Sequence, residues 1–308
     1  MGAAPKSIAP RSIAPKSTAP RNIAPKSIAV VPRTLDQAVR FLAGDPELVP
    51  VAGCTDLMVP GARVASRFER VLDLLRVREI RGIRRVEGGW QIGATTSFAE
   101  IARSRYLRST FPALAQAASQ IGGWQIQNRA TLGGNMANAS PAGDSLPVLL
   151  ALDAVVIAAS AGGLREIPYG RFHLSYRKTA LCKGEIIAWV RLRDPQGPGV
   201  QRFRKVGTRR AQAISKVVLA MAARWQEGRL ADVRFGAGSV APIPVRLCAA
   251  ERACEGALPD ASIAELAGAA ASGEVQPIDD VRSTAAYRRF VLGRLVRRMV
   301  LEAGDEAP

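Results

Sequence analysis

Histidine is almost absent from this 308-residue sequence, and its absence excludes several kinds of active site. With His173 as the single histidine, no site with two histidine ligands can form within one chain, and a Ser/His/Asp triad has one candidate base. The position of His173 between Phe172 and Leu174 favours a structural role. These limits argue against most hydrolases and metalloenzymes and favour chemistry carried by an organic cofactor.

Paired cysteines and common phosphate-binding motifs are also absent. Cys54, Cys182, Cys248 and Cys254 form no CxxC pair and show no spacing typical of zinc or iron–sulfur ligation. We therefore expect no metal site in this chain. Neither GxGxxG nor GxxxxGK(S/T) occurs, so the common dinucleotide and P-loop sites are not indicated.

Long apolar runs are missing as well. The longest apolar stretch, residues 146–161, carries Asp153 near its middle and is too short to cross a bilayer comfortably. No continuous apolar block follows the basic first residues, so a secretory signal is not supported. We expect a cytoplasmic protein without membrane insertion.

Aromatic residues make up 5% of the chain, which bears on the interpretation of its net charge of +17. Such a charge can indicate nucleic-acid binding, but no nucleic-acid module is recognisable and the aromatic residues are scattered. Arginines such as Arg288, Arg289, Arg297 and Arg298 lie in a helical segment, where a solvated face is the simplest interpretation. Contact with acidic partner subunits is the stronger expectation.

Residues 4–28 repeat the unit Ala-Pro-(Lys/Arg)-(Ser/Asn)-(Ile/Thr) five times. Proline recurs too often for a helix, so the pattern predicts a disordered or polyproline-like arm over residues 1–28. Two interpretations stay open, a basic tether for a partner surface and a tandem repeat without a role.

From Val30 onward the pattern is that of a mixed α/β protein. The predicted helices cover residues 35–43, 97–103, 112–120 and 283–302, and the predicted strands cover 48–52, 70–75, 82–86, 90–94, 154–158, 201–206, 217–225 and 231–236. Apolar residues at helical spacing from Tyr287 and Phe290 to Val300 predict that the last helix packs on a core. A turn-rich segment, 194–199, divides the chain into domains at 29–195 and 200–302.

Two glycine-bearing segments could hold a ligand. The first loop, Val51 to Leu57, follows a predicted strand and opens a predicted helix, a geometry that aims backbone N–H groups at a diphosphate. A structural turn of this kind is common, so this loop alone is weak evidence. The second loop, Ala130 to Ser145, combines small residues with side-chain donors and acceptors, and we expect its segment 131–143 to wrap closely around a polar ligand as an irregular loop.

The second loop, ATLGGNMANASPAGDS, resembles the second flavin loop of the FAD-binding subunits of the xanthine dehydrogenase and carbon monoxide dehydrogenase family. The first loop resembles the segment of that family that holds the FAD diphosphate. Residues 203–207, 209 and 214–217 resemble the start of its C-terminal flavoprotein domain. The similarity covers about residues 29–302.

This resemblance implies an α+β fold, with a two-part FAD-binding domain of the vanillyl-alcohol oxidase (PCMH) class followed by a smaller sheet-and-helix domain. It implies that Asp144 accepts hydrogen bonds near the adenosine ribose, and that Ile187 and Lys205 approach the isoalloxazine ring, where a positive charge favours the anionic reduced flavin. Core packing of Ile187 and a surface position of Lys205 stay open. The residues that the resemblance assigns to FAD are Ala52, Gly53, Cys54, Thr55, Asp56, Leu57, Ile121, Gly122, Thr131, Gly134, Asn135, Asp144, Ile187 and Lys205.

The sequence departs from the family pattern at three places. Cys54 stands where the family usually has Gly or Asn, and inert packing of its thiol is the simpler interpretation. Ile121-Gly122 occupies the stretch where some members place an aromatic residue against the flavin ring. Gln127 lies where relatives often have a further arginine.

The resemblance implies an electron-transfer subunit of a molybdenum hydroxylase rather than a chain with catalytic residues of its own. Electrons would pass from a small 2Fe-2S subunit to FAD in this chain and on to an external acceptor, while a large molybdopterin-binding subunit hydroxylates the substrate; the assembly would be a heterotrimer or another hetero-oligomer. Two alternatives stay open. One is a self-sufficient FAD-dependent oxidoreductase, for which His173 is the single histidine base. The other is a non-catalytic assembly protein of the same fold.

Overall fold

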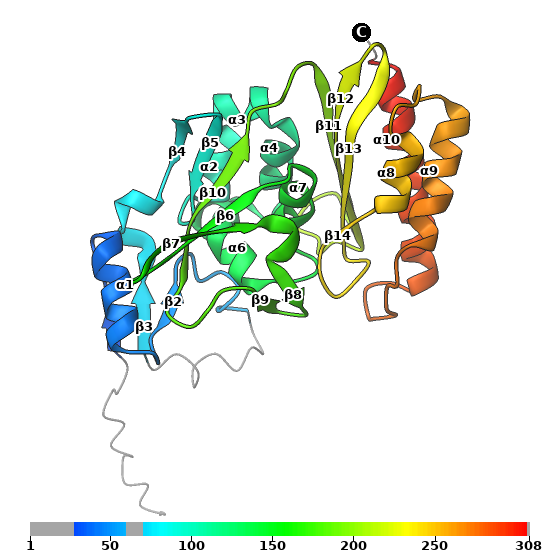
Figure 1. Ribbon diagram of the computed structural model, residues 1–308. Coiled ribbons are helices and arrows are strands. Elements are labelled where there is room, and N and C mark those ends of the chain that lie inside the picture. The colour runs from blue at the N-terminus through cyan, green and yellow to red at the C-terminus, as the bar shows by residue number, and fades with distance from the viewer. Residues whose placement is uncertain (1–27, 60–69, 307–308) are drawn as a thin grey trace, which may run out of the picture.

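The computed structural model describes residues 28–59 and 70–306, so the predicted arm over residues 1–28 lies almost entirely outside the described residues. The described residues form four sheets, of which the smallest is an insertion within the stretch of chain that forms the five-stranded sheet, and helices separate the two largest sheets (Figure 1). None of the described helices is long and apolar enough to cross a membrane.

The first described part is a three-stranded parallel sheet in the order β1-β3-β2 with one helix. Its elements are β1 (Ile28–Val30), α1 (Leu35–Gly44), β2 (Val49–Val51) and β3 (Arg70–Asp73), followed by short 3-10 helices at Leu74–Arg76 and Arg78–Ile80. Thr34 caps α1, which buries Ala38, Val39 and Leu42 at helical spacing. The first loop leaves the carboxyl end of β2, the edge at which parallel sheets commonly place ligand-binding loops.

The next part is a five-stranded antiparallel sheet in the order β4-β5-β10-β6-β7. The strands are β4 (Ile83–Val86), β5 (Gly89–Gly93), β6 (Val155–Ser160), β7 (Gly163–Pro168) and β10 (Ile186–Arg193). Residues of β6 alternate between two cores: Val156 and Ala158 belong to the core beneath the helices, and Ile157 and Ala159 to the core shared with the first part. This sheet is therefore buried on both faces along β6.

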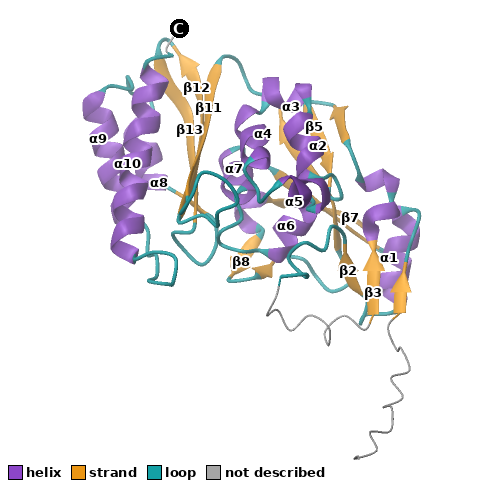
Figure 2. Ribbon diagram, turned by 180° about the vertical axis from the view of Figure 1, so that it is seen from behind, coloured by secondary structure: helices purple, strands orange, loops and turns teal. Residues whose placement is uncertain are grey.

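Six helices lie along the chain between β5 and β6, and a small hairpin lies between β7 and β10; in space the helices lie between the five-stranded and the four-stranded sheet (Figures 1 and 2). The helices are α2 (Phe98–Arg103), α3 (Arg105–Thr110), α4 (Pro112–Ser119), α5 (Trp124–Arg129), α6 (Leu132–Asn138) and α7 (Ser145–Ala151), and the hairpin consists of β8 (His173–Ser175) and β9 (Lys178–Thr179) after a 3-10 turn at Tyr169–Arg171. Ser97 forms a reciprocal capping box with Glu100 at the start of α2, as predicted for this helix.

The C-terminal part is a four-stranded antiparallel sheet, β11-β12-β13-β14, with helices on its far face. Its elements are β11 (Gly199–Val206), β12 (Val217–Gln226), β13 (Arg229–Gly238), β14 (Val245–Arg246), α8 (Cys248–Cys254), α9 (Ala261–Gly273) and α10 (Ala285–Gly304). Its near face packs on α4 and α7 so closely that a Cβ on Gly236 of β13 would lie 2.0 Å from the carbonyl oxygen of Pro147. The main core consequently continues from the helices into this sheet through Phe203, Val218 and Ala220.

The structure corrects three sequence-based predictions about local structure. The segment 131–143 is not an irregular loop throughout, because α6 forms within it where the Thr131 hydroxyl accepts a hydrogen bond from the Gly134 N–H. The first loop opens no helix within its described residues, since Cys54 has a left-handed backbone (φ 59°) and turns follow to Val59. On α10 the core-facing residues are Leu292, Val296, Met299 and Val300, whereas Tyr287 and Phe290 are exposed.

Candidate cofactor site

The first loop presents a row of backbone donors. In the described part of the chain, none of the N–H groups from Gly53 to Leu57 donates to a protein acceptor. Cys54 departs from the right-handed conformation at the start of this row, and its thiol donates to the carbonyl of Ala52 at 3.2 Å. Where a left-handed residue alternates with a right-handed neighbour, successive backbone N–H groups point toward the same side and form a concave site suited to an anion.

The two loops lie against one another at Gly53. A Cβ on this glycine would lie 1.9 Å from the carbonyl oxygen of Arg129 and 3.0 Å from the Cα of Ala130, where the second loop begins. Only glycine permits this approach without moving one of the two backbones. Ala52 to Leu57 and Thr131 to Asn135 thus form parts of one surface.

Within the second loop, hydrogen bonds between side chains and the backbone fix the polar residues. The oxygen of Thr131 accepts from the Gly134 N–H at 3.1 Å, and since Thr131 is 2% exposed its side chain caps α6 from within the protein. The Asn135 side-chain oxygen accepts from the Ser145 hydroxyl at 2.8 Å, which leaves the Asn135 amide hydrogens available for a ligand. Gly134 between them is exposed.

The carboxylate of Asp144 is held by the C-terminal sheet. One oxygen accepts from the Lys205 ammonium and the other from the Ser215 hydroxyl, each at 2.5 Å, and the side chains of Asp144 and Lys205 are 7% and 8% exposed. Burial raises the pKa of Asp144 above its ordinary value, and Lys205 and Ser215 oppose that rise. Both oxygens therefore already accept hydrogen bonds within the protein, and the role at the adenosine ribose that the resemblance implies for Asp144 stays a prediction.

Lys205 links this buried pair to the segment expected near the flavin ring. Its ammonium also donates to the carbonyl of Gln120 at 3.0 Å, next to Ile121 and Gly122. Gly122 and Lys205 line a single cavity of about 270 Å³ with Arg209, Arg210 and Gln212. Because Asp144 pairs with Lys205, it offsets much of the positive charge that Lys205 would bring to this cavity.

Ile187 does not lie at this surface. Its side chain is 5% exposed and packs in the main core beneath the helices. The core-packing alternative that the sequence left open is the one that these surroundings favour.

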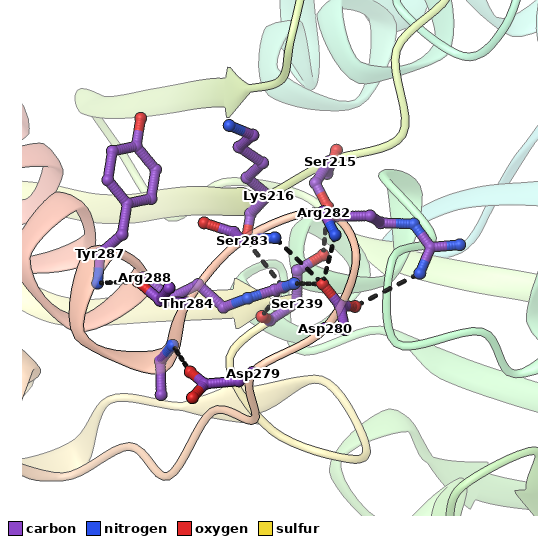
Figure 3. Close-up of polar contacts among 11 residues, drawn as sticks. Ser215, Lys216, Ser239, Asp279, Asp280, Arg282, Ser283, Thr284, Tyr287 and Arg288 are labelled. Atoms are coloured by element: carbon purple, nitrogen blue, oxygen red, sulfur yellow. Dashed lines mark hydrogen bonds and ion pairs between the residues drawn. The ribbon is translucent and has the colours of Figure 1, made fainter.

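A second buried polar cluster is connected to Ser215 (Figure 3); we call it the Arg288 cluster, and it consists of Arg288, Asp280, Ser239 and the backbone of Lys216. Arg288, 4% exposed, donates to the backbone oxygens of Lys216 at 3.1 Å and Ser239 at 2.7 Å, and to the Asp280 carboxylate at 2.7 Å. The Ser239 hydroxyl in turn donates to the backbone oxygen of Ser215. A continuous set of polar contacts thus runs from Asp280 through this cluster to Asp144.

The prediction that Arg288 lies on a solvated helix face was wrong. Tyr287 and Arg289 beside it on α10 are exposed, but Arg288 itself points at the ends of β12 and β13, where two backbone carbonyl groups accept its hydrogen bonds and Asp280 balances its charge. The pattern of charges along a helix does not reveal one buried arginine whose partners come from other segments.

Comparison with family models now decides the family. The model for the FAD binding domain in molybdopterin dehydrogenase matches residues 24–194, more than half of the chain, and the model for the CO dehydrogenase flavoprotein C-terminal domain matches residues 202–303. The chain belongs to the FAD-binding subunits of the molybdenum hydroxylases. The family expected from the two loops is confirmed, as is the order of a FAD-binding domain followed by a C-terminal domain.

Individual relatives of this FAD-binding subunit agree over nearly its whole length. The xanthine dehydrogenase FAD-binding subunit of Escherichia coli O157:H7 is 30% identical over 275 residues, which cover 88% of this chain and 93% of that protein. The glyceraldehyde dehydrogenase medium chain of Sulfolobus acidocaldarius is 28% identical and covers 87% of this chain and 95% of its own length. A chain of carbon monoxide dehydrogenase from Hydrogenophaga pseudoflava superimposes with a TM-score of 0.85 at 26% identity, covering 91% and 98% of the two chains.

His173 in this FAD-binding subunit is buried against Tyr169 and Phe172. Its Nε2 lies 3.1 Å from the Tyr169 hydroxyl, and burial lowers its pKa to about 4. A neutral ring packed in this way agrees with the structural role expected from the sequence. Among the described residues, no group of three or more histidine, cysteine or acidic side chains is placed to hold a metal ion.

Sequence reasoning missed three residues that organise the site of this subunit. Ser215 and Arg288 act from the C-terminal part, and Arg177, in the turn between β8 and β9, contacts both loops. Ser215 lay inside a motif that resembles the family, which was a usable signal. Arg177 and Arg288 follow no local pattern, so contacts between distant segments were needed to find them.

Proposed function

We propose that this chain binds FAD along the two loops and carries electrons between a partner subunit and an external acceptor. The observation that carries the proposal is the row of N–H groups from Gly53 to Leu57, which have no acceptor among the described residues and which meet the second loop at Gly53. The N–H row suits a diphosphate, and the small residues around it let a ligand approach the backbone.

The surrounding residues fit the remaining parts of FAD. Gly134 and Asn135 would close over the phosphates, since Gly134 is exposed and Asn135 retains side-chain hydrogens to donate, while the buried Thr131 would hold the start of α6 in place. The cavity at Gly122 and Lys205 would take an edge of the flavin ring, with the Arg209 and Arg210 loop as its outer wall. FAD, when bound there, supplies the redox chemistry, whereas the chain binds and orients it.

We assign Asp144 a supporting role in this site. Its carboxylate orients Lys205 toward Gln120 and the cavity, and Ser215 completes its hydrogen bonding. Ile187 would support the ring from the core rather than touch it.

The partners follow from the division of cofactors in this family. We propose that molybdopterin lies in a large subunit and 2Fe-2S clusters in a small one, because several relatives are named as medium chains or subunits of larger dehydrogenases. Relatives are named for xanthine, glyceraldehyde and carbon monoxide, so the organic substrate does not follow from the flavin subunit. Cytoplasmic residence remains the expectation from the sequence.

The test is to purify the full chain with its co-purifying subunits from the native host and record the visible spectrum and the released flavin. About one FAD per chain, reduced when the substrate of the complex is added, is expected. A colourless complex that takes up no added FAD would contradict both enzyme interpretations and leave the assembly protein. Reduction of the flavin by a substrate in the isolated chain would instead support the self-sufficient oxidoreductase.

A further inference from the structure

Arg177 joins the two loops from a third segment of the chain. Its Nη1 atom donates to the side-chain oxygen of Asn138 at 2.9 Å and lies 3.6 Å from a carboxylate oxygen of Asp56. Asn138 ends α6 in the second loop, and Asp56 belongs to the first loop. The β8–β9 hairpin that carries Arg177 lies next to α6 in both views of the molecule (Figures 1 and 2).

The position of Asp56 raises an electrostatic problem for the proposed site. Asp56 is one of the residues whose N–H groups would hold a diphosphate, so its carboxylate brings a negative charge to the same loop, and like charges repel each other. Asp56 is about half exposed, which weakens the repulsion without removing it. A positive charge beside Asp56 would offset the repulsion.

We propose that Arg177 completes the diphosphate site of the FAD-binding loops by neutralising Asp56 and holding it against Asn138. This inference rests on the proposed binding of FAD and adds a residue of the hairpin to the site. Arg177 adopts a left-handed backbone (φ 54°) at the tip of the hairpin, and this places its side chain toward the loops. Arg177 would act on the bound diphosphate only through Asp56 and Asn138, and it is therefore a positioning residue.

The test measures the Kd for FAD in the full chain within its purified complex, after the flavin has been removed, for four proteins: wild type, Arg177→Gln, Asp56→Asn and the double variant. We expect Arg177→Gln to raise the Kd about tenfold, because Asp56 then repels the diphosphate. Asp56→Asn should bind about as tightly as wild type. In the double variant the Kd should return to within about threefold of wild type, since the repelling charge is gone.

A matched control is Arg85→Gln, which removes an arginine of comparable exposure, 57% against 47%, that pairs with Asp194 away from both loops. It should leave the Kd unchanged. If wild type binds FAD but Arg177→Gln binds equally well, the inference is overturned. It is also overturned if the double variant binds as weakly as Arg177→Gln, because Arg177 would then act only by bracing the hairpin. A wild-type complex that binds no FAD overturns the proposed function and this inference with it.

Discussion

Replacing Lys205 by methionine removes the buried ion pair with Asp144 together with the hydrogen bond to the Gln120 carbonyl. Both side chains are at most 8% exposed, and the methionine fills most of the lysine volume while removing its charge. Removing one partner of a buried ion pair leaves the other uncompensated, which costs about 3–5 kcal/mol of folding free energy. For a chain of this size that corresponds to a fall in Tm of roughly 5–10 °C.

The loss should depend on pH with a defined sign. In the wild type burial already raises the pKa of Asp144, and without Lys205 the pKa rises further because the charged form has lost its partner. A carboxyl group whose pKa is raised in the folded state lowers the folding free energy most at pH values above its folded-state pKa, where it is charged. At low pH it is protonated in both states and costs little. The Tm difference between Lys205→Met and wild type should therefore shrink as the pH falls from 8 toward 5.

The assay is thermal unfolding followed by circular dichroism at several pH values. Lys216→Met is the matched control, because the Lys216 ammonium lies over the Tyr287 ring at 5.2 Å rather than on a buried carboxylate. The double variant Lys205→Met/Asp144→Asn should recover most of the lost stability, since a neutral amide replaces the unpaired charge. If Lys205→Met melts with the Lys216→Met control at pH 8, or if the asparagine gives no recovery, the account of the pair is wrong.

Three further changes test other parts of the site. Gly53→Ala should raise the Kd for FAD at least about tenfold, because its Cβ would lie 1.9 Å from the Arg129 carbonyl oxygen and force the loops apart; flavin titration measures this. Arg288→Met should lower the folding free energy by about 3 kcal/mol through the loss of its pair with Asp280 and of its bonds to two buried carbonyls, measured by urea unfolding. Burial raises the pKa of the Cys54 thiol, so alkylation should be slow at pH 7.5, should accelerate as the pH rises above the usual thiol range, and should slow when FAD is bound, measured by mass spectrometry.

Each of these changes has a control within the chain. Gly44→Ala, at the end of α1 where an added Cβ meets nothing within 4 Å, should leave FAD binding unchanged. Arg297→Met removes an arginine of the same helix that pairs with an exposed glutamate and should cost little. The exposed Cys182 should react at the same rate with and without FAD. Equal effects in variant and control would contradict the corresponding prediction.

The sequence predicted some of the helices and most of the strands in the described part of the chain, because the signals for these elements are local. Ser97 with Glu100, the glycine turn between β4 and β5, and the continuous apolar run of β6 can each be recognised within a few residues. The helix α6 was missed since two glycines lower its intrinsic helix propensity, and its cap at Thr131 depends on a hydrogen bond within the folded turn.

Only the parts of the candidate site that consist of contiguous sequence motifs could be predicted. The two loops can be recognised because each is an unbroken segment, and the structure brings them together at Gly53. The partners of Asp144 lie on β11 and just before β12, and those of Arg177 lie in two other segments. Such pairings depend on tertiary contacts, which no periodicity along the chain encodes.

The hold of the C-terminal sheet on Asp144 has a consequence for dividing this protein into modules. A fragment ending near residue 195 would contain both loops, yet it would strip Asp144 of Lys205 and Ser215 and leave the inner sides of α4 and α7 without the sheet that covers them. The boundary that is easiest to see in the sequence is thus a poor place to cut. A transplanted flavin module would need residues 199–239 to arrive with it.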